Sequence, residues 1–236
     1  MPQQPVVGKP SNVEVVRSYA TRFPTDEDPI SEGGMWLNGR DEGLDWANIL
    51  TRDGLAHGET IPMVVPERRR EQGDDVETSE GDYNDPTAIL KGQWGRNQHA
   101  KARVFSRNQT DERYHEVELR LRSELAEHRI PGYEVFFRCL KTEEGYAEIV
   151  RWEGPLGKWT SLCRKNGPEF GVKDGDIIEA TIIGNVIKGY INGVEVTSAT
   201  DDTYPSGSPG IGFNYGAEQT AGDHGFTYYE VETWDD

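Results

Sequence analysis

The chain has 236 residues, with 25 lysines and arginines against 42 aspartates and glutamates, and its formal net charge is −17. A surface this acidic repels phosphate backbones and anionic lipid, so nucleic acid and membranes are disfavoured as partners. The 27 glycines and 13 prolines, without long helical stretches, are typical of an all-β domain with many turns.

The N-terminal third contains few regular elements. Residues 1–12 are predicted to be a flexible lead-in, and residues 12–19 carry enough valine for a first strand. Residues 23–53 are loop-rich, and residues 66–86 are so polar that we expect an exposed loop there. We do not expect a domain boundary in this loop, because no separate apolar core lies on either side of it.

The segment 115–125 alternates apolar and charged residues, as a strand does when its two faces differ. One face carries Val117, Leu119, Leu121 and Leu125. The other carries Glu116, Glu118, Arg120, Arg122 and Glu124. We interpret the charged side as a solvated outer face with ion pairs between strands.

Further strands are predicted at residues 133–140, 146–152 and 159–163. Residues 177–198 form three apolar runs separated by Gly184-Asn185 and Asn192-Gly193, which suit the tight turns of a β-meander. Two last strands are expected near residues 210–215 and 226–234. The number and spacing of these strands predict a sandwich or barrel.

The run from Asp176 to Val196, followed by the glycine-rich segment from Ser206 to Phe213, resembles a recurrent part of concanavalin A-like lectin and glucanase domains. The resemblance implies one jelly-roll domain over residues 13–236, with two antiparallel sheets, one of them concave, and the last strand beside the first. It also implies a polysaccharide or oligosaccharide bound across the concave sheet. We expect a secreted or periplasmic protein whose leader is not visible in the sequence, and the oligomeric state stays open.

Glucanases of the laminarinase type carry two carboxylates on one strand in a pattern such as E-x-D-x-x-E. The nearest segment here starts at Glu116 and Glu118, but Arg120 and Arg122 stand before the next carboxylate. An alginate-type lyase is also a poor match, because only its R-[ST]-E-L motif has a counterpart, at residues 122–125.

A lyase of another family remains open, since it needs arginine beside a proton-transferring side chain. The candidate catalytic residues are Arg120, Arg122, Glu118, His115 and Tyr133.

Sugars stack on aromatic rings and bond to polar groups beside them. The candidate substrate-binding residues combine both types: Trp94, Trp152, Trp159, His99, Arg138, Glu148 and Arg151. For any single tryptophan a place in the core is the competing interpretation.

The resemblance further implies a structural calcium ion near the chain ends, for which Asp26 and Asp235 offer hard oxygen ligands. For Cys139 and Cys163 we favour two buried free thiols over a disulfide.

The sequence is compatible with three functions. The first is glycan binding, the second is glycan cleavage in the same groove by a lyase or hydrolase, and the third is that of a module that binds protein.

Overall fold

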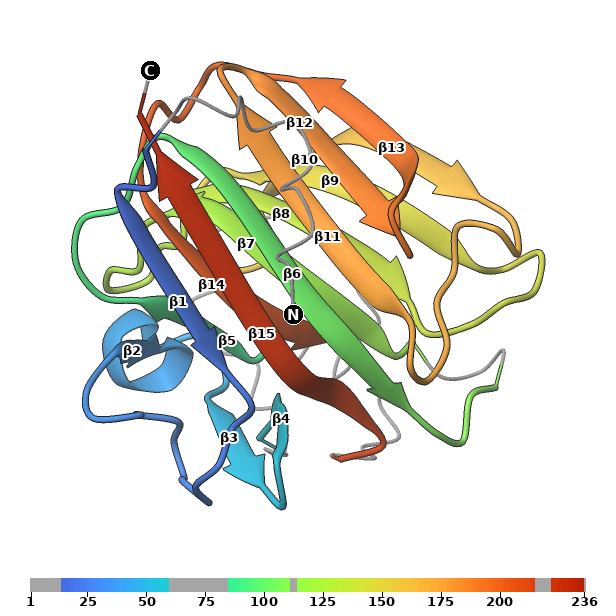
Figure 1. Ribbon diagram of the computed structural model, residues 1–236, viewed down its shortest axis with the longest axis horizontal. Coiled ribbons are helices and arrows are strands. Elements are labelled where there is room, and N and C mark those ends of the chain that lie inside the picture. Colours follow the sequence, from blue (N-terminus) through green and yellow to red (C-terminus); the bar gives the residue numbers. More distant parts are fainter. Residues whose placement is uncertain (1–13, 60–84, 111–113, 215–221, 236) are drawn as a thin grey trace, which may run out of the picture.

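The computed structural model describes residues 14–59, 85–110, 114–214 and 222–235. The expected lead-in and almost all of the expected polar loop at 66–86 lie outside these residues. The described chain is a sandwich of two stacked antiparallel sheets (Figure 1). Within this part of the chain, no helix is long and apolar enough to span a bilayer.

The first sheet has eight strands. Their order is β13 (Val194–Thr200), β12 (Val186–Ile191), β11 (Ile177–Ile183), β6 (Asn97–Ser106), β15 (His224–Trp234), β4 (Leu55–Gly58) and β3 (Ile49–Arg52). The eighth strand, β1 (Arg17–Thr21), pairs with the last strand, β15, as expected.

The second sheet has seven strands. Their order is β10 (Trp159–Asn166), β9 (Tyr146–Trp152), β8 (Gly132–Arg138), β7 (Glu116–Ser123), β14 (Ser208–Asn214), β5 (Thr87–Leu90) and β2 (Trp36–Asn38). A short π-helix, η1 (Gly39–Gly43), follows β2.

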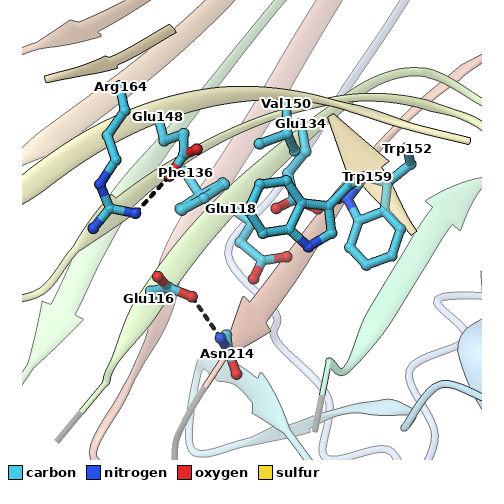
Figure 2. Close-up of a pocket in the computed structure, with 10 residues that line it drawn as sticks. All are labelled: Glu116, Glu118, Glu134, Phe136, Glu148, Val150, Trp152, Trp159, Arg164 and Asn214. Carbon is cyan, nitrogen blue, oxygen red and sulfur yellow. Dashed lines mark hydrogen bonds and ion pairs between the residues drawn. The ribbon is translucent and has the colours of Figure 1, made fainter. Parts of the chain in front are cut away.

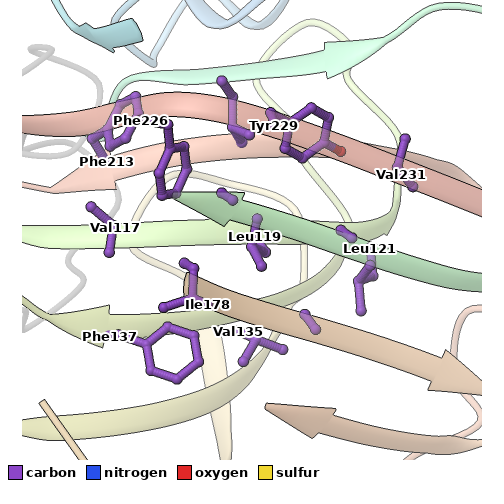
Figure 3. Close-up of a cluster of buried hydrophobic side chains, with 14 of the residues drawn as sticks. Val117, Leu119, Leu121, Val135, Phe137, Ile178, Phe213, Phe226, Tyr229 and Val231 are labelled. Carbon is purple, nitrogen blue, oxygen red and sulfur yellow. The ribbon is translucent and has the colours of Figure 1, made fainter. Parts of the chain in front are cut away.

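The main core lies between the two sheets (Figure 3). Val117, Leu119 and Leu121 point into it from β7, as the alternation predicted, and Ile178 faces them from β11. Both turns of the meander form as expected, because Gly184, Asn192 and Gly193 adopt the positive φ angles that such turns need. The concanavalin A-like jelly-roll sandwich is therefore confirmed.

A second apolar cluster lies on the outer face of the seven-stranded sheet. Its members are Trp46, Ile89, Leu125, Ile130, Phe136, Tyr146, Val150 and Trp152. Trp46 follows η1, and Leu125 and Ile130 flank the turn after β7, so segments outside the strands partly cover this face.

The charged side of β7 was predicted to be a solvated outer face, and this prediction is wrong for three of its residues. Glu116, Glu118 and Arg120 do share one face with ion pairs between strands, but all three side chains are buried and none is solvated. Leu125 belongs to the outer cluster and not to the core between the sheets.

The two cysteines are free thiols. Cys139 is buried, and burial raises its pKa to about 12, whereas Cys163 on edge strand β10 is only partly covered.

Candidate functional site

A small pocket opens on the outer face of the seven-stranded sheet, with a volume of about 100 Å³. Ten side chains from five strands line it (Figure 2): Glu116, Glu118, Glu134, Phe136, Glu148, Val150, Trp152, Trp159, Arg164 and Asn214. Four of them are glutamates and one is an arginine, so carboxyl groups are the most frequent polar groups of the lining.

Strand register explains why these residues meet. Glu118 on β7 lies opposite Phe136 on β8, which lies opposite Glu148 on β9. Arg164 on β10 completes this row beside Glu148. Because side chains alternate between faces, every second residue of β7, β8 and β9 points into the same space. In β10 a bulge after Ser161 brings Arg164 to the same face as Trp159.

Arg120 lies beneath the pocket and joins three carboxyl groups. Its Nη2 atom is 2.8 Å from Glu134 Oε2, 3.0 Å from Asp85 Oδ1 and 3.4 Å from Glu118 Oε2. The Arg120 side chain is fully buried, and its guanidinium lies 5.3 Å from the centre of the Trp152 ring.

Burial shifts the titration of this cluster. Burial is the largest cause that raises the pKa of Glu134, to about 8, while the Arg120 charge opposes the shift. Burial and the neighbouring Glu134 and Asp85 raise the pKa of Glu118 well above its ordinary range. One guanidinium cannot neutralise three carboxylates, so the cluster favours holding protons.

The two remaining glutamates of the pocket have their own partners. Glu148 pairs with Arg164 Nη1 at 2.7 Å. Glu116 accepts hydrogen bonds from the Tyr146 hydroxyl and, at 2.6 Å, from Asn214 Nδ2. Burial raises the pKa of Glu116 despite these two bonds.

Trp159 and Trp152 form the aromatic wall. They lie opposite each other on β10 and β9. Trp152 is buried and donates from Nε1 to Glu134 Oε2 at 2.8 Å, whereas 40% of Trp159 is exposed. An indole left open to solvent at the mouth of a polar pocket can stack on a ligand.

Gly212 on β14 leaves the space that Glu118 occupies. A β-carbon at this position would clash with Glu118 Oε2. The glycine therefore allows the Glu118 carboxyl group to lie over the neighbouring strand.

A metal ion does not fit the acidic cluster. Among the described residues, Asp85, Glu118 and Glu134 are the one group of three potential ligands, with oxygens within 4.8 Å of one another. The Arg120 guanidinium already lies at ion-pair distance from all three. A metal ion bound by all three oxygens would lie against this guanidinium and be repelled by its charge.

The structure brings several of the sequence-predicted residues together. Glu118, Glu148, Trp152 and Trp159 line the pocket, and Arg120 lies beneath it.

Three predicted catalytic residues lie elsewhere. Arg122 has a φ of 46° beside a β-bulge and leaves the charged face, so its guanidinium donates to the backbone carbonyls of three different loops. His115 stacks on His224 with ring centres 4.4 Å apart. Tyr133 points into the core, and its hydroxyl donates to Asp201 Oδ1 at 2.7 Å.

The remaining predicted substrate-binding residues do not line the pocket. Arg138 lies one row away, opposite Glu116, and donates to the Glu144 carbonyl. Arg151 pairs with Asp201 at 2.7 Å. Trp94 is part of the core. His99 bonds Glu179 at 2.8 Å in the eight-stranded sheet, which is the other layer of the sandwich.

Asp26 and Asp235 do not form a common calcium site. Asp26 accepts from the backbone N–H of Asp53, and Asp235 accepts from that of Arg96. Because β1 runs antiparallel to β15 with Thr21 opposite Tyr229, the two aspartates follow opposite ends of this pairing.

Sequence reasoning missed Glu134, Asp85 and Arg164 as members of the site. Glu134, Phe136 and Arg138 alternate with core residues in β8, which was a usable signal for their common face. Only the register between strands shows that Glu134 meets Arg120.

No family model and no curated protein sequence matches this chain. Solved structures do share its fold. Carbohydrate-binding module CBM66 from Bacillus subtilis is 11% identical with a TM-score of 0.52, over 88% of this chain and 98% of that one. The carbohydrate recognition domain of Emp47p is 9% identical with a TM-score of 0.53, over 92% and 95%.

An endo-β-galactosidase from Clostridium perfringens that releases GlcNAcα1-4Gal is 11% identical, with a TM-score of 0.53 over 98% of this chain and 64% of that one. At such low identity these similarities establish the fold, which serves binding proteins and enzymes alike.

Proposed function

We propose that this protein binds a polysaccharide or oligosaccharide on the outer face of the seven-stranded sheet. The observation that carries the proposal is Trp159, a 40% exposed indole beside four pocket-lining glutamates. Aromatic stacking favours the C–H face of a sugar ring, and carboxylates accept hydrogen bonds from its hydroxyls. Two structures of this fold are themselves described as a carbohydrate-binding module and a carbohydrate recognition domain, which supports the proposal.

The dimensions of the pocket define how a glycan is held. A volume of about 100 Å³ admits one substituent or ring edge and not a whole chain. The chain itself then runs along the sheet surface, with one sugar ring against Trp159 and its polar groups near Glu148 and Arg164. Polysaccharides occur mainly outside the cytoplasm, so the proposal includes a secreted or periplasmic location for this protein.

Retention on a panel of immobilised neutral, acidic and amino polysaccharides tests the proposal. We expect retention on one glycan class, lost in Trp159→Ala because the stacking surface is removed. Val194→Ala is the control, since Val194 is an exposed apolar residue on the other sheet. No retention on any glycan, or equal retention by both variants, would reject this site.

Glycan hydrolysis is the second candidate function, favoured by Glu118 and Glu134. Their carboxyl oxygens lie within 4.8 Å of each other, and retaining glycosidases hold two carboxyl groups about 5–5.5 Å apart. The pKa of Glu134, raised to about 8, suits a proton donor at neutral pH. Arg120 lies at ion-pair distance from both carboxyl groups, and its charge opposes the rise in the pKa of each.

An assay of new reducing ends together with absorbance near 235 nm separates the two functions. Hydrolysis yields reducing ends without the absorbance of an unsaturated uronate, and Glu134→Gln abolishes it. A rise in absorbance instead indicates a lyase, for which the separated positions of His115 and Tyr133 give no support. Binding without either signal leaves the binding function alone.

A further inference from the structure

The pocket holds more acidic than basic groups. Among the described residues in, beneath and beside it, five carboxyl groups belong to Asp85, Glu116, Glu118, Glu134 and Glu148. The guanidinium groups are three, those of Arg120, Arg138 and Arg164. Even if every guanidinium neutralises one carboxylate, two carboxyl groups are left to take up a proton or to meet a cation from outside these described residues.

The position of the imbalance is specific. Among the described residues, Arg120 is the one cation that pairs with Asp85, Glu118 and Glu134. Two of these three, Glu118 and Glu134, line the pocket. Glu148 has its own arginine at 2.7 Å. An ammonium group entering beside Glu118 and Glu134 would therefore take the place of a proton that these carboxyl groups otherwise hold, and it would find charged acceptors there.

The aromatic wall gives a second and independent indication. Trp159 at the mouth and Trp152 behind it present indole faces, which attract cations as well as C–H groups. The Arg120 guanidinium already lies 5.3 Å from the centre of the Trp152 ring. A ligand with a sugar ring and an ammonium group can stack its C–H groups on one indole and place its positive charge near the other.

We infer that the pocket selects a glycan with free amino groups, such as a β-linked glucosamine oligomer, over its N-acetylated counterpart. The inference rests on the proposed glycan binding and names its substrate class. The ring stacks on Trp159, and the ammonium donates to Glu118 and Glu134. The overall charge of −17 adds attraction for a polycationic chain.

Titration calorimetry of the full chain with a glucosamine hexamer and with the N-acetylated hexamer tests the inference, at a pH where the amine is protonated. We expect the free-amine oligomer to bind about tenfold tighter or more, because its ammonium group makes charge-assisted hydrogen bonds that the N-acetyl group cannot make. Glu118→Gln and Glu134→Gln should bring the two oligomers close to equal affinity. Glu195→Gln is the matched control, since it removes one exposed carboxylate from the other sheet.

Equal or tighter binding of the N-acetylated hexamer overturns the inference. So does an equal loss of affinity in Glu195→Gln, or competition by a lysine hexamer as strong as that by the glucosamine hexamer, since either would mean attraction by charge alone. If neutral glycans bind through Trp159 but glucosamine gains nothing, the inference fails and the proposed function stands. If no glycan binds at all, both fail.

Discussion

Arg120 and Glu134 form a buried ion pair across neighbouring strands, with 2.8 Å between Nη2 and Oε2. The two residues are direct partners in the register of β7 and β8. The same Glu134 oxygen accepts from Trp152 Nε1 at 2.8 Å, so the pair ties the acidic cluster to the aromatic wall. The proposed ligand site is thereby joined to a buried ion pair that holds β7 and β8 together.

Removing Arg120 should destabilise the protein strongly. Arg120→Ala leaves Asp85, Glu118 and Glu134 buried without their common cation, and breaking such a buried pair costs about 3–5 kcal/mol. Urea unfolding measures the loss. Arg107→Ala serves as control, because it breaks the pair with Asp223 from an arginine that is 60% exposed. A loss of stability in Arg120→Ala no larger than in this control would contradict the role given to Arg120.

Glu134 should make the protein less stable as the pH rises. Its pKa is raised from 4.5 to about 8 in the folded state, chiefly by burial. Folding therefore favours the protonated form, and the stability gained below pH 4.5 is lost as the pH rises toward 8. Glutamine imitates the protonated group, so Glu134→Gln should gain stability relative to the parent between pH 5 and about 8.

Unfolding of both proteins in urea at several pH values measures this difference. A difference that is constant over the range, or that changes in the opposite direction, would contradict the raised pKa of Glu134.

Gly212→Ala should impair binding more than a comparable glycine substitution elsewhere. The added β-carbon would clash with Glu118 Oε2 and displace this carboxyl group, and overpacking costs about 1–3 kcal/mol. Gly189→Ala is the matched control, since its β-carbon meets Thr197 and Val135 inside the sandwich. We expect both variants to lose stability and only Gly212→Ala to lose glycan affinity. Equal affinities would show that the position of Glu118 does not matter for binding.

Arg122 should matter for stability and not for binding. Its guanidinium donates to the carbonyls of Arg96, Tyr204 and Gly184, which belong to three separate loops. Arg122→Ala is expected to cost roughly 2–4 kcal/mol, since several charge-assisted bonds are lost at a buried site. Arg122→Lys should restore little, because one ammonium group cannot span three loops. Loss of binding or turnover without loss of stability would contradict this prediction and support the original assignment of Arg122 as a catalytic residue.

The alternating and turn patterns were sufficient to predict most of the fold. Strand β9 has the predicted bounds, and the meander follows from Gly184, Asn192 and Gly193, whose positive φ angles are a local requirement. Such signals are local in sequence and need no knowledge of the partner strand.

The site was less predictable because it depends on contacts between distant segments. Glu118 and Glu134 were brought together by register, which alternation does not specify. Trp46, which packs against Trp152 on this face, comes from a segment that is not a strand. The bulge that turns Arg122 away from Arg120 also has no counterpart in the alternating pattern.

The most direct test of the central claim is a crystal structure with the best-retained oligosaccharide bound. We predict a sugar ring stacked on Trp159, with a substituent in the pocket between Glu118, Glu134 and Glu148 (Figure 2). A saccharide bound on the eight-stranded sheet, near His99 and Glu179, would contradict the account.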